Sequence, residues 1–387
     1  MLTPQKDSQR AIAPLGPDSR GHLEDTTRWT LCIGAGVSQG IVPLWEDLTI
    51  KVVNRVFDSH YDKTSFRAAV AASRWGLDSW IQAAANEHRR KTENRGSFSV
   101  ILQQELYGDL LRLAEGDGVR RDVFHALQSF HWDAVTEANT VCEFFNRHYK
   151  HTSLMRLVDW LLLAERAGKM PFAIISFNVE PLFHMVFNCF QRQAYGDDYP
   201  KFHLERVTKP NFVRSDPPFR PGNSRTVFVY HCHGSQIPHV HGSRGSVPMT
   251  GVGNAVFLEE DYLDISGHAA TWPETLFMYH ANFSRMVFVG LSMSDPNIRH
   301  WLGLSHQQTD AGKVLRGGRK QPPHLWIEKS PNAEMRRVLE AGLSHLGVTP
   351  AWIPNWEVVG DAMKNLTDCG APIRPRSTAG RAKRRVG

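Results

Sequence analysis

The stretch TLCIGAGVSQG, residues 30–40, joins a short apolar run to a glycine-rich segment. TLCI predicts a buried strand and GAGVSQG predicts a tight turn. After the turn, apolar side chains recur at helical spacing from Trp45 to Val56. A strand, a glycine turn and a helix in this order are typical of α/β proteins that bind a nucleotide phosphate at the turn. A tight turn that binds no ligand fits the same residues.

The rest of the chain supports an α/β fold. Residues from about 60 to 168 look mostly helical, and the run LMRLVDWLLLAERAG ends at Gly168, a residue suited to a helix C-cap. Short apolar runs then follow: FAIISF (172–177), TVFVYHCHG (226–234), AVFLEEDY (255–262), MVFVGLSM (286–293) and HLWIEK (324–329). Runs that are apolar on both faces predict buried parallel strands between layers of helices.

Composition predicts how the chain is divided. The chain has 387 residues, 41% of them hydrophobic, which is enough to bury a large core. We expect a flexible N-terminal arm over 1–28, one domain over 29–371 with a helical insertion at about 60–168, and a basic tail over 372–387. The segment from residue 370 onward carries six basic residues and no acid, which equals the net charge of +6. The folded body is therefore near neutral, and the tail is either a solvated end or a contact for nucleic acid.

Several classes of protein are disfavoured. The N-terminus has no apolar core behind a positive start, and no apolar run approaches the roughly 18 residues of a spanning helix. The five cysteines contain no C-x-x-C pair, which argues against a disulfide framework and a zinc ribbon. The region IKVVNRVFDSH continues a helix where a dehydrogenase would have a second strand ending in an acid. We expect a soluble, cytoplasmic protein.

The stretch VFVYHCHGSQIPHVHGS, residues 227–243, concentrates four histidines. On a strand, His231 and His233 would project to one face because the side-chain period is two. His239 and His241 could form a second pair across a turn, and four imidazoles suit zinc, copper or nickel. No carboxylate lies in this stretch. A metal site therefore stays open as an alternative.

Four segments in order resemble one family. They are GAGVSQGIVPLW (34–45), ISFNVE (175–180), YHCHGS (230–235) and VGLSMSDPNIR (289–299). Together they resemble the sirtuins, with the likeness spanning roughly residues 29–330. The resemblance implies a Rossmann-like sirtuin fold with a central parallel sheet, a large helical insertion and, in this chain, no zinc ribbon.

The resemblance also implies a set of site residues around NAD. Gly34, Ala35, Gly36 and Ser38 would line the diphosphate and the adjacent ribose, Asn178 would contact the nicotinamide ribose and orient water, His233 would be the base, and Gly290 and Ser292 would hold the adenosine side. Cleavage of the nicotinamide bond passes through an oxocarbenium-like state, for which a water-positioning carboxamide and a base near neutral pKa are useful. Histidine suits that base role.

Two departures from the family refine the expected activity. The absence of C-x-x-C pairs removes most support for protein deacylation, and Glu180 replaces the usual aspartate, which puts its direct cofactor role in doubt. The chain instead resembles the sirtuin-like NAD hydrolases of bacterial antiphage defence. This likeness implies NAD depletion without a required metal, a homo-oligomer, and a HerA-type ATPase or an Argonaute-like protein as partner.

Other interpretations of the same residues stay open. A non-catalytic sensor that binds NAD or ADP-ribose could use the glycine loop, and a metal-dependent hydrolase could use the cluster from His231 to His241. Asn178 at a strand end could be a plain turn residue. Asp295 followed by Pro296 predicts a helix start rather than a catalytic acid. The acids at 259–261 similarly predict the first turn of a helix.

Overall fold

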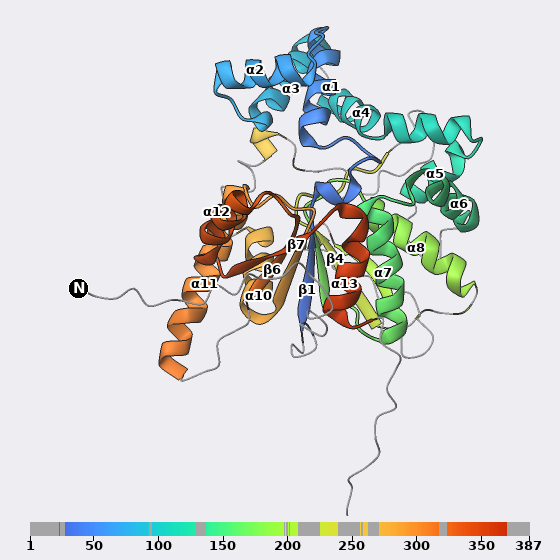
Figure 1. The fold of residues 1–387 in the computed structure, drawn as a ribbon. Coiled ribbons are helices and arrows are strands. Elements are labelled where there is room, and N and C mark those ends of the chain that lie inside the picture. The colour runs from blue at the N-terminus through green and yellow to red at the C-terminus, as the bar shows by residue number, and fades with distance from the viewer. Residues whose placement is uncertain are drawn as a thin grey trace, which may run out of the picture.

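A parallel sheet forms the centre of the molecule. The computed structural model describes residues 23, 28–92, 95–128, 137–196, 198, 200, 202–207, 225–238, 256, 258–261, 271–316 and 323–369. Within these ranges seven strands form one sheet in the order β3-β4-β2-β1-β5-β6-β7 (Figure 1). Every neighbouring pair is parallel. The predicted α/β fold with a central parallel sheet is therefore confirmed.

The strands are β1 (Trp29–Ile33), β2 (Ala173–Ser176), β3 (Phe202–Val207), β4 (Arg225–His231), β5 (Arg285–Val289), β6 (His324–Lys329) and β7 (Val348–Ile353). The helices are η2 (Ala35–Ser38), α1 (Trp45–Phe57), α2 (Lys63–Ser73), α3 (Leu77–Thr92), α4 (Arg95–Gly116), α5 (Arg120–Gln128), α6 (Ala138–Tyr149), α7 (Ser153–Ala167), α8 (Leu182–Tyr195), α10 (Trp272–Phe283), α11 (Pro296–Arg316), α12 (Ala333–Ser344), η4 (Trp356–Val358) and α13 (Val359–Thr367). None of these helices is long and apolar enough to cross a membrane.

Both faces of the sheet are buried at its central strands β1, β2 and β5. In β1, Leu31 and Ile33 join the core shared with α7, α8 and α13, whereas Cys32 between them joins the core shared with α10, α11 and α12. Figure 1 shows these two groups of helices on opposite sides of the strands. Because successive side chains point to opposite faces, a strand covered on both sides is apolar throughout, as the sequence TLCI predicts.

Between α1 and β2 the described residues form helices joined by short turns. Helices α1 to α4 lie together at one end of the sheet, above the strands in Figure 1. Helix α7 instead packs against α8 and α13 and belongs to the layer that covers the sheet. It ends where the sequence predicts, at Gly168 with φ of +70°, the left-handed geometry of a C-cap glycine. Part of the insertion thus covers a face of the sheet, and part lies beyond one end of the strands.

The prediction of a strand over residues 255–262 was wrong. Residues 259–261 are helical, and the backbone N–H of Leu258 donates to the Asp261 carboxylate at 3.1 Å, as at a helix start. The Glu260 carboxylate accepts from the Arg89 guanidinium of α3 at 2.8 Å. Polar contacts with α3 therefore fix this segment, and the acids have the helix-start role that their order predicts.

Two edge strands, β3 and β7, were not predicted from the sequence. β3 is FHLERV, whose second half is polar, and β7 is VTPAWI, which contains Pro350. Proline cannot donate to a sheet ladder, and it is tolerated on edge strands. Both strands lie at the outer ends of the sheet order, where one flank has no neighbouring strand in the sheet.

One residue of the predicted N-terminal arm packs on the domain. Leu23 is 4% exposed and lies in the core, and its backbone N–H donates to the oxygen of Leu366 in α13 at 3.2 Å. Apart from this residue and Arg28, the arm over 1–28 lies outside the described residues, as does the basic tail over 372–387.

Candidate functional site

The predicted site residues follow the carboxyl ends of four neighbouring strands. Strand β1 pairs with β2 on one side and with β5 on the other, so the chain changes direction across the sheet at β1. Ligands of open parallel sheets bind outside the carboxyl ends of the strands at such a switch point. The loop over 34–38 follows β1, and the loop over 290–295 follows β5. The two predicted NAD-binding loops therefore flank the switch point.

These two loops touch backbone to backbone. The N–H of Gly34 donates to the oxygen of Val289 at 3.0 Å, and the N–H of Gly36 donates to the oxygen of Gly290 at 2.9 Å. A Cβ on Gly34 would lie 2.6 Å from the Gly290 oxygen. Gly290 has φ of +63°, and its Cβ would lie 2.5 Å from the nitrogen of Val37. Loop packing therefore requires these glycines whether or not a phosphate binds nearby.

The turn after β1 differs in detail from a simple strand-to-helix turn. The loop first forms the short 3-10 helix η2, in which Ala35 is exposed and Ser38 is buried. The α-helix begins only at Trp45. The predicted order of strand, glycine turn and helix is confirmed, and η2 directs the Ser38 hydroxyl toward the end of β2.

A buried polar cluster joins the ends of β1 and β2. The Ser38 hydroxyl donates to Glu180 Oε1 at 2.6 Å, and Asn178 Nδ2 donates to the same oxygen at 2.8 Å. Glu180 Oε2 accepts from the backbone N–H of Leu182 at 2.7 Å, at the start of α8. All three side chains of the cluster are at least 96% buried. Ser38 and Asn178, which were predicted separately, are thus brought into one network.

The sequence did not predict that Glu180 would join this network. Burial raises its pKa to about 7, and the hydrogen bonds from Ser38, Leu182 and Asn178 lower it in opposition. The only sequence signal is an acid two residues after Asn178 in ISFNVE. Contact with Ser38 depends on the juxtaposition of β1 and β2, across 142 residues of chain.

The side-chain carbonyl oxygen of Asn178, Oδ1, differs from its other polar groups in its hydrogen bonding. Its backbone N–H donates to the Ser176 hydroxyl at 3.2 Å, and its backbone oxygen lies 3.3 Å from His231 Nδ1. Among the residues that the structure describes, Asn178 Oδ1 has no hydrogen-bond partner although it is buried. A buried acceptor without a partner is costly and is frequently reserved for a ligand or water.

His233 follows β4 in a turn, next to the β2 end. Strands β2 and β4 pair with Ser176 opposite His231, so Asn178 and His233 each lie two residues beyond this register. The His233 ring packs edge-on against Phe177 at 5.6 Å between centroids. Burial lowers the pKa of His233, while the negative charge of Asp295 and a hydrogen bond with the Phe177 backbone oppose that shift. A neutral imidazole is the form that accepts a proton.

The loop after β5 combines exposed hydroxyls with a helix cap. The Ser292 hydroxyl is exposed and lies 2.6 Å from that of Ser294. Asp295 Oδ1 accepts from the backbone N–H groups of Asn297 at 2.8 Å and Ile298 at 3.3 Å. Helix α11 begins at the next residue, as predicted. Asp295 therefore has two effects: it caps α11 and it acts electrostatically on His233.

The histidines of the possible metal site have different neighbours. His231 is buried, and burial together with the charge of Arg206 lowers its pKa to about 4. His233 instead contacts Phe177 and senses Asp295. Within the described part of the chain, no group of three or more His, Cys, Asp or Glu side chains could hold a metal ion. His239 and His241 lie outside the described residues.

The helical insertion is attached to the segment that carries His233. The Tyr107 hydroxyl of α4 donates to the backbone oxygen of Gln236 at 2.5 Å. The N–H of Gln236 in turn donates to the oxygen of Val179, between Asn178 and Glu180. Helix α4 therefore connects through one residue to the loop that holds the polar cluster.

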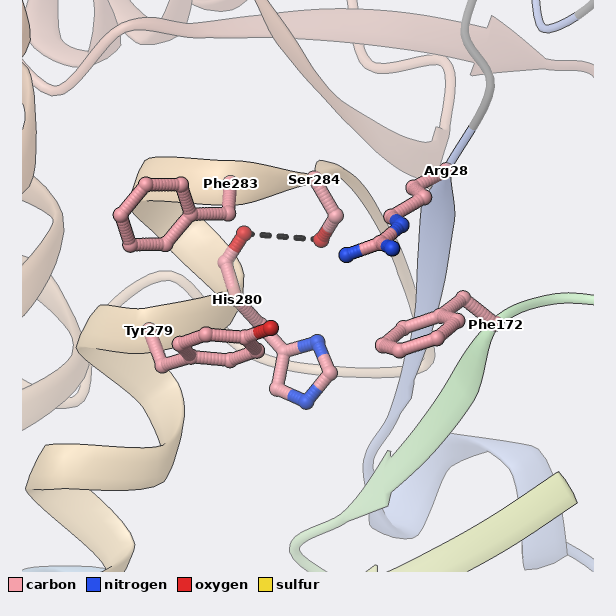
Figure 2. Close-up of a pocket in the computed structure, with 6 residues that line it drawn as sticks. All are labelled: Arg28, Phe172, Tyr279, His280, Phe283 and Ser284. Atoms are coloured by element: carbon pink, nitrogen blue, oxygen red, sulfur yellow. Dashed lines mark hydrogen bonds between the residues drawn. The ribbon is translucent and has the colours of Figure 1, made fainter.

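A shallow hollow lies at the opposite, amino edge of the sheet, away from these residues. Figure 2 shows the side chains that line it: Arg28, Phe172, Tyr279, His280, Phe283 and Ser284. Thr30 in β1 bonds to both His280 Nδ1, at 2.9 Å, and the Ser284 hydroxyl, at 2.8 Å. This arrangement satisfies buried polar groups and contains none of the predicted site residues.

Comparison with known protein families relates part of the chain to a described domain. No curated protein matches the chain. A family model described as the SIR2-like domain matches residues 173–346. The matched range runs from β2 to the end of α12, so it includes Asn178, His233 and Gly290 but not the loop over 34–38. This match, on a parallel sheet with the expected loops at its switch point, supports a sirtuin-like family and an NAD-related activity for the chain.

Proposed function

We propose that the protein hydrolyses NAD to nicotinamide and ADP-ribose, with Asn178 and His233 as the catalytic residues. The observation that carries the proposal is the buried carbonyl oxygen of Asn178, which has no hydrogen-bond partner among the described residues and lies beside Ser38 and Glu180 at the switch point. An acceptor in this position suits a water or a ribose hydroxyl. The SIR2-like match supports NAD as the ligand.

The chemistry needs groups that these residues can supply. When the bond between nicotinamide and ribose breaks, positive charge develops on the sugar, as in glycoside hydrolysis. The Asn178 carbonyl would accept a hydrogen bond from the attacking water. His233, whose pKa burial lowers, would accept a proton. No metal is needed for these steps.

The two glycine loops would hold the substrate. In this proposal Gly34, Ala35, Gly36 and Ser38 line the diphosphate and its ribose, while Gly290 and Ser292 hold the adenosine side. The backbone contact between the loops supports a shared role, because it fixes the distance between the two halves of the NAD site. The exposed Ser292 hydroxyl and the exposed Ala35 are accessible to a ligand.

The test is an NAD-cleavage assay on the purified protein, with and without candidate partners. Asn178→Ala and His233→Ala should each lower the rate of nicotinamide release by about 10²–10⁴-fold. The matched controls Asn139→Ala and His345→Ala change exposed residues of α6 and of the α12 C-cap, and they should cleave like the wild type. Unchanged cleavage in both site variants would remove the site assignment.

The same preparation separates the alternatives. Binding of NAD or ADP-ribose in calorimetry with no nicotinamide release, even with a partner present, would favour a non-catalytic sensor. Stoichiometric zinc, copper or nickel in elemental analysis would favour a metal-dependent hydrolase that uses the cluster from His231 to His241.

We further propose a role in antiphage defence, in which the protein, as a homo-oligomer, depletes cellular NAD after an infection signal. The support is the resemblance to bacterial sirtuin-like NAD hydrolases, which also suggests a HerA-type ATPase or an Argonaute-like protein as partner. The test is cellular NAD during phage infection, measured with the candidate partner co-expressed. NAD should fall with the wild type and stay constant with Asn178→Ala; equal NAD in both would refute this role.

A further inference from the structure

The contacts of Glu180 determine which end of the Asn178 carboxamide points into the site. An ionised carboxylate only accepts hydrogen bonds, so the group that Asn178 turns toward Glu180 Oε1 at 2.8 Å must be its NH₂. The Ser38 hydroxyl occupies the same oxygen, and the Leu182 N–H occupies the other. The Asn178 carbonyl oxygen is consequently directed away from Glu180, where it has no partner among the described residues.

This orientation matters because the two ends of a carboxamide have nearly the same shape and opposite chemistry. The oxygen accepts a hydrogen bond, whereas the NH₂ donates. A water or hydroxyl that attacks a sugar carbon must lose a proton, so an acceptor assists it and a donor opposes it. We infer that Glu180 is a positioning residue that holds Asn178 with its carbonyl oxygen toward the reacting atoms. This inference rests on the proposed NAD hydrolysis.

The surroundings of Glu180 combine burial, which raises its pKa, with hydrogen-bond donors, which lower it. The elements packed against it present Ser38 from η2, the Leu182 N–H from α8, Asn178 from the β2 end and Tyr107 from α4. The Tyr107 hydroxyl donates to the backbone oxygen of Gln236. Burial raises the pKa of Tyr107, and its electrostatic interaction with Glu180 raises it further. Burial raises the pKa of Glu180 to about 7. A protonated Glu180 gains an O–H donor and no longer requires the Asn178 NH₂.

A matched pair of variants tests the role in catalysis. Glu180→Gln removes the titrating, acceptor-only group, and Glu165→Gln makes the same change at another buried carboxyl whose pKa burial raises to about 7. The Glu165 carboxylate accepts hydrogen bonds from the Gln191 side chain and from the Phe202 N–H. Phe202 begins the edge strand β3, so Glu165 lies toward the amino ends of the strands, whereas Glu180 follows the carboxyl end of β2. We expect Glu180→Gln to lower kcat by about 10- to 100-fold, with little change in KM, and to remove the dependence of kcat on pH near 7.

Glu165→Gln should keep the wild-type kcat and pH profile. Glu180→Asp, which retains an acceptor-only carboxylate, should retain more of kcat and of its pH dependence than Glu180→Gln. Equal kcat values and pH profiles in Glu180→Gln and Glu165→Gln would overturn the inference.

A second measurement does not depend on turnover. In protein labelled with ¹⁵N at asparagine, the side-chain amide signals of Asn178 are those missing from Asn178→Asp. They should shift in Glu180→Gln and stay unchanged in Glu165→Gln; signals that are the same in wild type and Glu180→Gln would overturn the inference. If the wild type releases no nicotinamide, the proposed function fails, and these amide signals still decide whether Glu180 orients Asn178.

Discussion

Replacing Gly290 by alanine tests whether the glycines at the switch point serve the fold. Gly290 has φ of +63°, a region that costs an L-residue about 1–2 kcal/mol. Its new Cβ would lie 2.5 Å from the Val37 nitrogen and 2.9 Å from the Gly36 carbonyl carbon. Because these neighbours are backbone atoms, the loops would have to separate, at a further cost of about 1–3 kcal/mol.

We therefore expect Gly290→Ala to lower the free energy of unfolding by about 2–5 kcal/mol. A domain has only about 5–15 kcal/mol in total, so the loss should be plain in urea denaturation followed by circular dichroism. The control is Gly342→Ala in α12, where a Cβ meets no atom within 4 Å. Alanine favours helix, so this variant should be unchanged or up to about 1 kcal/mol more stable.

A loss below about 1 kcal/mol in Gly290→Ala would refute the reasoning. Normal stability combined with lost NAD binding would show that glycine is needed at position 290 to make room for the ligand, and not to allow packing against the loop over 34–38. The assay therefore separates two explanations of the same glycine pattern.

Three more predictions concern charge and the helical insertion. Burial raises the pKa of Glu165 from 4.5 to about 7, so between these pH values the folded state binds more protons than the unfolded state. The free energy of unfolding should therefore fall as pH rises through this window, by at most about 3 kcal/mol. Glu165→Gln should flatten this pH dependence in urea denaturation at several pH values. Asp295→Asn keeps an N-cap but removes the charge that raises the pKa of His233, so the acidic limb of the kcat/KM profile should move to lower pH; an unmoved limb would contradict the electrostatic contact. Tyr107→Phe leaves the Gln236 oxygen without its donor and should cost about 1–3 kcal/mol in the same denaturation assay; a smaller loss would mean that the hydrogen bond is weak.

The sequence predicts the centre of the sheet better than its margins. β1, β2, β5 and β6 place side chains in the cores on both faces, so their apolar runs are continuous and easy to recognise. One face of β4 is only half-buried, but its residues there include Phe228 and Tyr230, so the run still stands out. The edge strands β3 and β7 carry polar residues or proline, because one flank has no strand beside it. The run over 255–262 is apolar in part, yet its acids bond to α3, and a contact so distant in sequence leaves no periodic signal.

For the site, the sequence locates loops but not the contacts between side chains. The glycine loops and Asn178 lie at one sheet edge because they directly follow parallel strands, which order alone predicts. The Ser38 to Glu180 contact depends on which strands become neighbours and on the path of η2, and neither is encoded locally. His231 and His233 would share a face on a continuous strand, but β4 ends at His231 and the chain turns.

The position of β1 has a consequence for any attempt to divide the protein. The SIR2-like match covers residues 173–346, but β1 lies outside it and is the strand that joins β2 to β5. A fragment of 173–346 would leave the flanks of β2 and β5 without the strand that bridges them, and unpaired strand edges favour aggregation. We therefore expect the matched segment to be a region of sequence similarity that does not fold by itself. We expect it to be insoluble by itself and to become soluble when the chain from β1 onward is restored.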